Sequence, residues 1–275
     1  MTATAPLAPR HTAPPLRLDS GENGVFTLTL ARPEARNALS LAMLDALRDA
    51  LAGIAADQSV RAVVLAADGP VFSSGHDLKE ITAARAESDA GRAFFEETLA
   101  RCAGVMQAIV ALPQPVIAAV EGVATAAGCQ LVASCDLAIA GANARFCTPG
   151  VNIGLFCSTP MVALSRNLSR KHAMEMLLTG DMVGADEAAR FGLVNRVVAA
   201  GGAGAAAQEM ATKIAAKSAL TVKIGKRAFY EQAEMGLADA YVHAGRVMVE
   251  NLLARDAAEG ISAFIGKRSP EWQDR

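Results

Sequence analysis

The sequence predicts an α/β fold that is followed by an all-helical segment. In the first part of the chain, short apolar runs typical of strands alternate with longer stretches whose apolar residues recur every three or four positions. After Gly201-Gly202-Ala203-Gly204 the strand patterns stop, and the chain reads as helix as far as Lys267. We therefore expect a flexible tail over residues 1–15, an α/β core over 16–200 and a helical segment over 201–275.

The first elements of the core are predicted from local patterns. Over residues 25–30, apolar residues alternate with threonine, as in a half-buried strand. Ser40 is placed to cap a helix over 41–54, because leucines follow it at spacings of three and four. A continuous apolar run over 60–66 predicts a buried strand. Residues 71–80 are polar and contain glycine, so we expect them to break helical structure.

Two prolines organise the middle of the core. Pro113 and Pro115 end a helix predicted over 90–112 and open a buried strand over 116–120. The remaining core elements, in chain order, are a helix over 126–134, a strand over 137–140, helices over 161–180 and 184–191, and a strand over 195–198.

Composition excludes several functional classes. The chain has 26 basic and 28 acidic residues, a net charge of −2, which argues against general nucleic-acid binding. No apolar run reaches the roughly 18 residues of a membrane-spanning helix, so no membrane partner is expected. The five cysteines lie mostly in apolar runs without C-x-x-C spacing, which indicates buried thiols in a reducing compartment. The four histidines are scattered, so no metal site is predicted.

The first 15 residues bear on location. They are rich in Ala, Pro and Thr, with Arg10 as the single cation. They lack the cationic start and apolar stretch of a signal peptide. A mitochondrial transit peptide is an alternative that one arginine supports only weakly. We expect a cytoplasmic protein.

Two segments differ from ordinary structural sequence, residues 72–80 and 115–131. In the second, a strand passes through a turn into a helix that begins Ala126-Ala127-Gly128, where small residues let a ligand approach free N–H groups. Gly75 allows the same approach in the first segment. One N–H from each segment would form a two-donor oxyanion hole. From spacing alone, tight packing is the more common reason for such small residues.

Over nearly the whole chain, from about Leu16 onward, the sequence resembles the crotonase superfamily, the enoyl-CoA hydratase/isomerase family. Within it, the sequence looks closest to the enoyl-CoA hydratase-domain-containing proteins. The resemblance rests on the blocks at residues 31–40, 72–80, 115–136, 146–155 and 180–197.

The resemblance implies a spiral of ββα turns, with a C-terminal helical segment that forms a homotrimer or a dimer of trimers. The ligand would be an acyl-CoA thioester, with no cofactor beyond the coenzyme A of that substrate. Its thioester oxygen would accept hydrogen bonds from the backbone N–H groups of His76 and Ala127. By the same likeness, the residues lining the ligand path are Ala38, Gly75, His76, Asp77, Leu78, Lys79, Ala126, Ala127 and Gly128.

The sequence departs from the family at its acid–base positions. Enoyl-CoA hydratases use two catalytic glutamates, which hold water and shuttle a proton. In this chain the position of the first is occupied by Gln130 and that of the second by Gly150. Gln can orient water but cannot act as its base, and Gly has no side chain. Some relatives use an acid further on, at a position that is Ser158 here. We therefore expect an enzyme of lyase or isomerase type that stabilises a thioester enolate with non-standard acid–base groups. The alternatives are an acyl-CoA-binding pseudoenzyme and, less favoured, an assembly role.

Several residues have simpler interpretations. For His76, a role of the backbone N–H alone is favoured over the ring as a base, and for Cys157 a buried structural thiol is favoured over a nucleophile. Ser158 and Thr159 could cap a helix starting at Pro160 or contact substrate. Glu121 would end a strand. Asp77 and Lys79 would stabilise their loop, and Lys79 could alternatively pair with a CoA phosphate. Lys223, Lys226 and Arg227 would form a solvated face.

Overall fold

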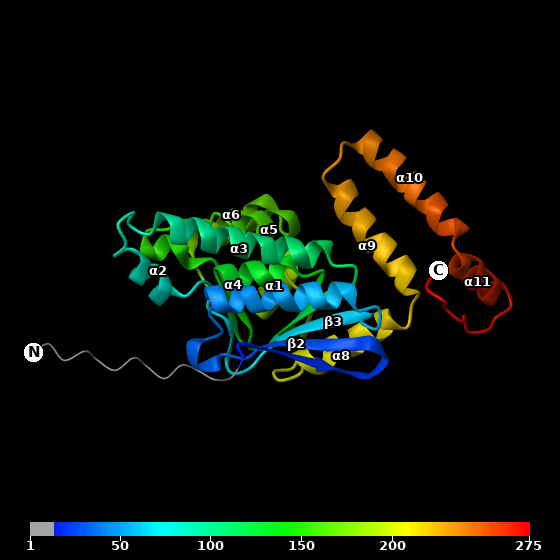
Figure 1. Ribbon diagram of the computed structural model, residues 1–275, viewed down its shortest axis with the longest axis horizontal. Helices are drawn as coiled ribbons and strands as arrows, with labels where there is room; N and C mark the ends of the chain where they lie inside the picture. The colour runs from blue at the N-terminus through cyan, green and yellow to red at the C-terminus, as the bar shows by residue number, and fades with distance from the viewer. Residues whose placement is uncertain (1–13) are drawn as a thin grey trace, which may run out of the picture.

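The computed structural model describes residues 14–275, so the predicted tail lies almost wholly outside the described residues. A six-stranded sheet forms the centre of the molecule (Figure 1). Its neighbouring strands are parallel except for the first pair, which is antiparallel. In spatial order it consists of β1 (Leu16–Ser20), β2 (Val25–Leu30), β3 (Ala62–Ala67), β5 (Val116–Val120), β7 (Leu137–Gly141) and β10 (Arg196–Val198).

A second sheet has four short strands, and most of them follow strands of the first sheet along the chain. It consists of β4 (Val71–Ser73), β6 (Val123–Thr125), β8 (Arg145–Cys147) and β9 (Val183–Gly184). Each of β3, β5 and β7 is followed by a strand of this second sheet and then by helical structure. The chain thus repeats a ββα unit, which confirms the predicted α/β spiral with a helical C-terminal segment.

Apart from α2, which was not predicted, the helices of the core agree with the predictions in type. Ser40 caps α1 by accepting a hydrogen bond from the Met43 N–H at 3.3 Å. The single helix predicted over 161–180 is divided in two, because Ser169 starts a new helix by accepting from the His172 N–H at 3.4 Å. The core helices are α1 (Leu41–Ala56), α2 (Leu78–Ala84), α3 (Arg92–Ala111), α4 (Ala127–Ser134), α5 (Pro160–Asn167), α6 (Arg170–Thr179) and α7 (Ala185–Phe191).

The prediction of irregular structure over residues 71–80 was wrong in part. The segment contains strand β4 and the start of α2. Strand β4 is only three residues long, and Ser73 within it is fully buried, so no alternation is visible in the sequence. Asp77 starts α2 by accepting a hydrogen bond from the Lys79 N–H at 2.8 Å.

Helix α8 (Ala203–Ala215) follows the predicted boundary but packs against the large sheet. Alanines at every fourth position, from Ala203 to Ala215, contact apolar residues of the strands, and their small size allows close approach. Glu121 was expected only to end a strand. Its carboxylate also accepts hydrogen bonds from Gly201 N, at 2.8 Å, and from Ala203 N. Glu121 therefore caps α8 from a distant part of the chain.

The last three helices extend from the body as an arm (Figure 1). They are α9 (Ala219–Ala233), α10 (Leu237–Leu253) and α11 (Arg255–Ile265). The interpretation of Lys226 as part of a solvated face was wrong. Its ammonium group donates to the Ile109 carbonyl at 2.9 Å, to the Gln114 carbonyl at 3.0 Å and to the Asp136 carboxylate at 2.7 Å. This buried cation attaches the arm to the body. Within residues 14–275, no helix is long and apolar enough to cross a membrane.

Candidate functional site

The two segments singled out in the sequence meet in the structure. Gly75, in the loop after β4, has a φ of +83°, which glycine adopts without a steric penalty. A side chain on Gly75 would begin 3.0 Å from the Ala126 Cβ, 3.1 Å from the Thr125 carbonyl oxygen and 3.2 Å from the Ala127 nitrogen. The absence of a side chain at position 75 is therefore what lets the loop lie against the start of α4.

Ala126 connects β6 to α4 in a conformation that is rare for a residue with a side chain. Its φ is +50° and its ψ is −119°. Such strain persists only where the surroundings enforce it, and it concentrates at functional sites. Here the Ala126 N–H donates to the Cys147 carbonyl at 3.0 Å, which fixes the turn. Gly128 follows, and a Cβ there would lie 2.4 Å from the Ser73 carbonyl oxygen. Tight packing thus accounts for Gly128.

The backbone N–H groups of His76 and Ala127 remain available. Leu39 pairs with His76 as an isolated parallel bridge and donates from its own N–H to the Gly75 carbonyl at 2.8 Å. In that pattern the N–H of His76 points away from Leu39. Neither this N–H nor that of Ala127 donates to an acceptor within the part of the chain that the structure describes. Because Ala127 begins α4, its N–H also lies at the positive end of a helix dipole.

A neighbouring segment supports the loop, and the sequence reasoning missed its main residue. Asn37 is fully buried and its amide donates to the carbonyl oxygens of Asp68, at 2.9 Å, and Val71, at 2.8 Å. Its carbonyl accepts from the Ser73 hydroxyl at 2.9 Å. Ala38, next in the chain, is buried beside it. An Asn inside a Pro-containing turn was the one available signal of this role.

The His76 ring is largely buried. Both of its nitrogens are closed to solvent and have no hydrogen-bond partner among residues 14–275. Burial lowers the pKa of His76, and the nearby Leu39 backbone opposes this only in part. The ring is therefore neutral near pH 7.

The three residues that follow His76 lie at the start of α2. Asp77 caps that helix, which agrees with its interpretation as a loop-stabilising residue. Leu78 and Lys79 are exposed, with Leu78 at 55%. Their side chains are accessible to a ligand that lies along the loop.

Gln130 lies one helical turn beyond Ala127, on the same face of α4. It is only 4% exposed, and its Oε1 atom is buried without a hydrogen-bond partner in the described residues. A buried amide oxygen without a donor is costly unless a ligand or water supplies one. Gln130 is therefore a candidate contact for a bound molecule.

Gly150 is buried in the short 3₁₀ turn Pro149–Ile153. A Cβ at position 150 would lie 2.9 Å from the Cys157 Sγ atom and 2.9 Å from the Leu155 carbonyl oxygen. The Leu155 N–H in turn donates to the Gly150 carbonyl at 2.9 Å. The position therefore has neither a side chain nor room for one.

Ser158 is exposed, and its hydroxyl donates to the Phe156 carbonyl at 3.3 Å. Thr159 precedes α5 but its side chain makes no capping hydrogen bond, so the capping interpretation of these two residues was wrong. Pro160 starts the helix instead, because its fixed φ suits the first helical position and it has no N–H to satisfy.

Comparison with known proteins assigns the chain to a family. A model of the family described as enoyl-CoA hydratase/isomerase matches residues 20–275. The chain belongs to the enoyl-CoA hydratase/isomerase family. It is 48% identical to the mitochondrial enoyl-CoA hydratase domain-containing protein 3 of Rattus norvegicus over 251 residues, 91% of this chain and 82% of that relative. It is 34% identical to a probable enoyl-CoA hydratase of Mycobacterium leprae, over 94% of this chain and 98% of that one.

Solved structures of the enoyl-CoA hydratase/isomerase family superpose closely. An enoyl-CoA hydratase from Mycobacterium smegmatis is 55% identical with a TM-score of 0.90, covering 94% of this chain and 99% of that one. The human enoyl-CoA hydratase domain-containing protein 3 is 45% identical with a TM-score of 0.89, covering 94% and 100%. These results confirm the resemblance seen in the sequence, including that to the hydratase-domain-containing members.

The comparisons contradict the expected cytoplasmic location. Family members at 44–48% identity are named as mitochondrial proteins. The expectation rested on the composition of residues 1–15, which is a weak indicator of location.

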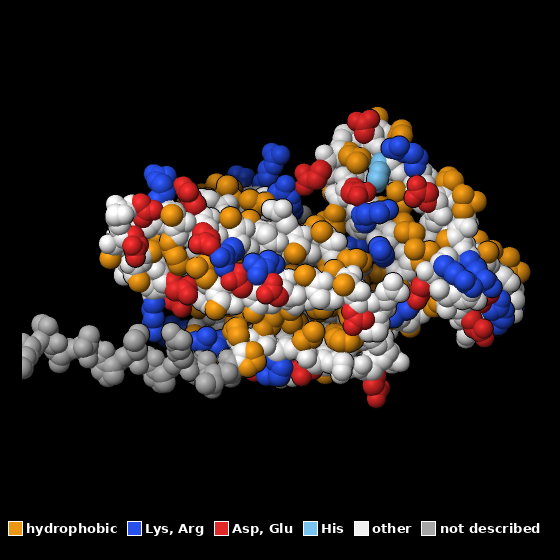
Figure 2. All heavy atoms as spheres, viewed as in Figure 1, with side chains coloured by type: hydrophobic (Ala, Val, Ile, Leu, Met, Phe, Trp, Pro, Cys, Tyr) orange, Lys and Arg blue, Asp and Glu red, His pale blue; other side chains and the backbone are white. Residues whose placement is uncertain are grey.

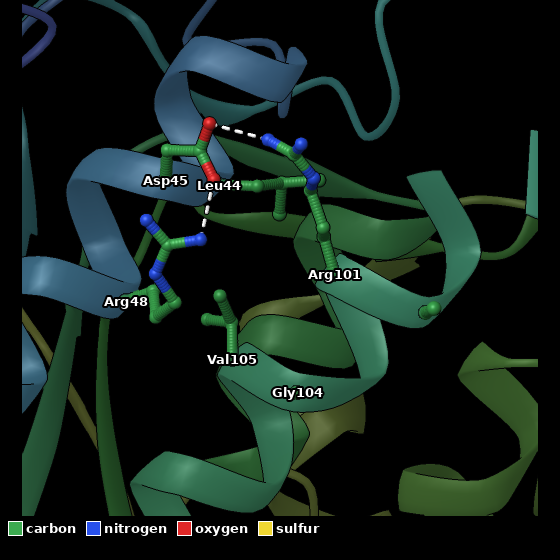
Figure 3. A pocket seen from close by; sticks show the side chains of 7 residues that line it. Leu44, Asp45, Arg48, Arg101, Gly104 and Val105 are labelled. Carbon is green, nitrogen blue, oxygen red and sulfur yellow. Dashed lines mark hydrogen bonds and ion pairs between the residues drawn. The ribbon is translucent and has the colours of Figure 1, made fainter. Parts of the chain in front are cut away.

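A surface groove between α1 and α3 lies apart from these family positions (Figure 3). It has a volume of about 460 Å³, and none of the predicted site residues lines it. Asp45 points between Arg48 and Arg101 and pairs with both; its distance to Arg48 is 2.8 Å. Arg101 also pairs with Glu97. Since its cations are already neutralised, the groove is a weak candidate for an anionic ligand.

Proposed function

We propose that this chain binds an acyl-CoA thioester and holds the thioester oxygen between the backbone N–H groups of His76 and Ala127. The observation that carries the proposal is this pair of unpartnered N–H groups on two segments in contact. Gly75 and Ala126, both at positive φ, hold those segments together. Exposed Leu78 and Lys79 flank the path that the rest of the ligand would follow.

The chemistry that such a site supports is stabilisation of an enolate. Negative charge develops on the thioester oxygen when a bond to the adjacent carbon forms or breaks, and two preorganised donors stabilise that charge more than they stabilise the neutral ester. Gln130 would hydrogen-bond a water or the ligand through its unpartnered oxygen. Neither Gln130 nor Gly150 can transfer a proton, so hydration by two carboxylates is not the proposed reaction.

Binding without turnover is the second candidate. Cys157 and Leu155 fill the space around position 150, and this favours binding without turnover. A side chain at position 150 that could hold and activate a water has no room. The two candidates share the binding step and differ in whether any acyl-CoA is converted.

We further propose that the arm forms a homotrimer, or a dimer of trimers. Large apolar side chains are exposed along it, and Figure 2 shows apolar atoms on its outer face. Surfaces of this kind are typically covered by a partner. The exposed residues include Phe229, Leu237, Tyr241, Val249, Leu253, Phe264 and Ile265. Sedimentation at micromolar concentration should show a trimer or a hexamer, and a stable monomer would refute this.

Calorimetry with a non-reactive ketone analogue of an acyl-CoA, in which a methylene group replaces the thioester sulfur and the carbonyl oxygen is kept, tests the binding proposal, beside a turnover screen with acyl- and enoyl-CoA esters. The informative variant is Ala127→Val, because Ala127 is 1% exposed and a larger side chain would displace its N–H. Ala203→Val is the matched control, since Ala203 is also a fully buried first residue of a helix. We expect weakened binding only in Ala127→Val. No saturable binding by the parent protein at millimolar ligand would exclude the proposed function.

A further inference from the structure

The thiol of Cys157 takes the place beside Gly150 that a longer side chain would fill. Its Sγ atom lies 2.9 Å from the Cβ position of residue 150. The family resemblance puts at that position a carboxylate that takes part in holding water. In this chain the sulfur atom of Cys157 lies against that position, which carries no side chain.

Cys157 lies near two other thiols, and one of them directly precedes Gln130 on α4. Cys129 on α4 and Cys147 at the end of β8 lie near enough that a Cys157 thiolate would raise the pKa of each. No disulfide joins them, and the described residues contain no cluster of metal-ligating side chains. Gln130 follows Cys129 on α4, is more than nine-tenths buried, and has an Oε1 atom without a partner. A buried oxygen of this kind indicates space for a hydrogen-bonding ligand.

We propose that Cys157 is a nucleophile that adds to the β-carbon of an α,β-unsaturated acyl thioester bound in the candidate site. The proposal rests on the proposed function, because the thioester must first bind between the His76 and Ala127 N–H groups. The S–H bond breaks and the sulfur forms a bond to the β-carbon. The π electrons of the Cα=Cβ bond then form a double bond between the α-carbon and the carbonyl carbon, and the carbonyl π electrons move to the thioester oxygen, which gives an enolate. The thiol proton ends on the α-carbon, so the product is a stable thioether and nothing leaves.

The thiol is a slow nucleophile in this position. Burial raises the pKa of Cys157, and an interaction with the Gly150 backbone opposes this only in part. The expected behaviour is therefore stoichiometric labelling in a single turnover, not catalysis. The His76 and Ala127 N–H groups hold the ligand close to the thiol, and this proximity compensates for the low reactivity of the thiol.

The test is incubation of the full chain with crotonyl-CoA, followed by intact-mass measurement and peptide mapping. The saturated ester butyryl-CoA is the control ligand, and its binding is measured by calorimetry. We expect a gain of one crotonyl-CoA per chain, mapped to Cys157, with no gain from butyryl-CoA. Cys157→Ser should lose the adduct, and Cys102→Ser, which changes a buried thiol on α3, should keep it.

The outcomes separate the two proposals. Binding of butyryl-CoA without any crotonyl-CoA adduct, or with an adduct mapped to a different cysteine of the parent chain, overturns the role of Cys157 and leaves the proposed function standing. Absence of binding and of labelling overturns both. Because the mapping uses the parent chain, the test holds even if Cys157→Ser fails to fold.

Discussion

The amide nitrogen of Ala127 lies 3.2 Å from the point where a side chain on Gly75 would begin. The two residues belong to different ββα units, and their contact brings the His76 and Ala127 N–H groups onto neighbouring segments. The candidate site therefore depends on what position 75 lacks. A methyl group there would press on the donor itself.

Gly75→Ala should weaken binding of an acyl-CoA analogue more than it weakens the fold. An alanine at positive φ costs about 1–2 kcal/mol of stability. Gly201→Ala is the control, since Gly201 has a φ of +82° and open space around its Cβ position. Denaturation should show the cost of positive φ in both variants and an additional loss in Gly75→Ala from the close contacts of its methyl group, and calorimetry should show reduced affinity only for Gly75→Ala. Equal affinities in the two variants would contradict the proposed position of the thioester oxygen.

Glu121 and Gly141 should show strong energetic coupling. The Glu121 carboxylate caps α8. A Cβ on Gly141 would lie 2.3 Å from the Oε2 atom of Glu121. Glu121→Ala should cost about 1–2 kcal/mol through the lost cap. Gly141→Ala should cost a similar amount, because the new methyl group displaces the carboxylate.

In the double variant Glu121→Ala with Gly141→Ala, the methyl group has room, so the loss should be smaller than the sum of the single losses. Urea denaturation of the four proteins measures this. Additive losses would show that the two residues act independently.

Sequence patterns predicted those elements whose signal is local. The spacing of leucines after Ser40 gave α1, and the threonine alternation gave β2. Both signals come from one face of one element being buried. Strand β4 gave no such signal, because three residues are too short for alternation and Ser73 is a buried polar residue.

Contacts between distant parts of the chain could not be predicted in the same way. Lys226 looks like any cation on an amphipathic helix until Asp136 is seen beside it. The identity of residue 150 was visible in the sequence, and the resemblance gave it meaning. Its closure by Cys157 was not visible, because that depends on how the turn after Gly150 folds back.

Lys226→Met should loosen the arm from the body. The Lys226–Asp136 pair is nearly closed to solvent, with side-chain exposures of 7% and 14%. Removing one partner of a buried ion pair typically costs about 3–5 kcal/mol, because the other charge stays buried. Lys223→Met, an exposed position on the same helix, is the control. The midpoint of thermal unfolding should fall markedly in Lys226→Met alone, and equal midpoints would argue against an anchoring role.

Restoring the two carboxylates should not restore hydration of crotonyl-CoA. Loss of a positioned acid–base group typically costs 10²–10⁴-fold in rate, about 3–5 kcal/mol, and this chain lacks both. Gln130→Glu alone leaves the second position empty. Adding Gly150→Glu forces a side chain into the space of the Cys157 sulfur and the Leu155 carbonyl, each 2.9 Å from the new Cβ.

The sulfur can be removed by Cys157→Ala, but the Leu155 carbonyl belongs to the backbone and stays. We therefore expect the triple variant, in which all three substitutions are combined, to bind the acyl-CoA analogue less tightly than Gln130→Glu does and to hydrate crotonyl-CoA no faster. Loss of the enoyl absorbance measures hydration directly, and calorimetry on the same samples measures binding. A rate in the double or triple variant approaching that of a two-glutamate hydratase would show that the turn after Gly150 opens readily, and that the missing side chains alone had prevented the reaction.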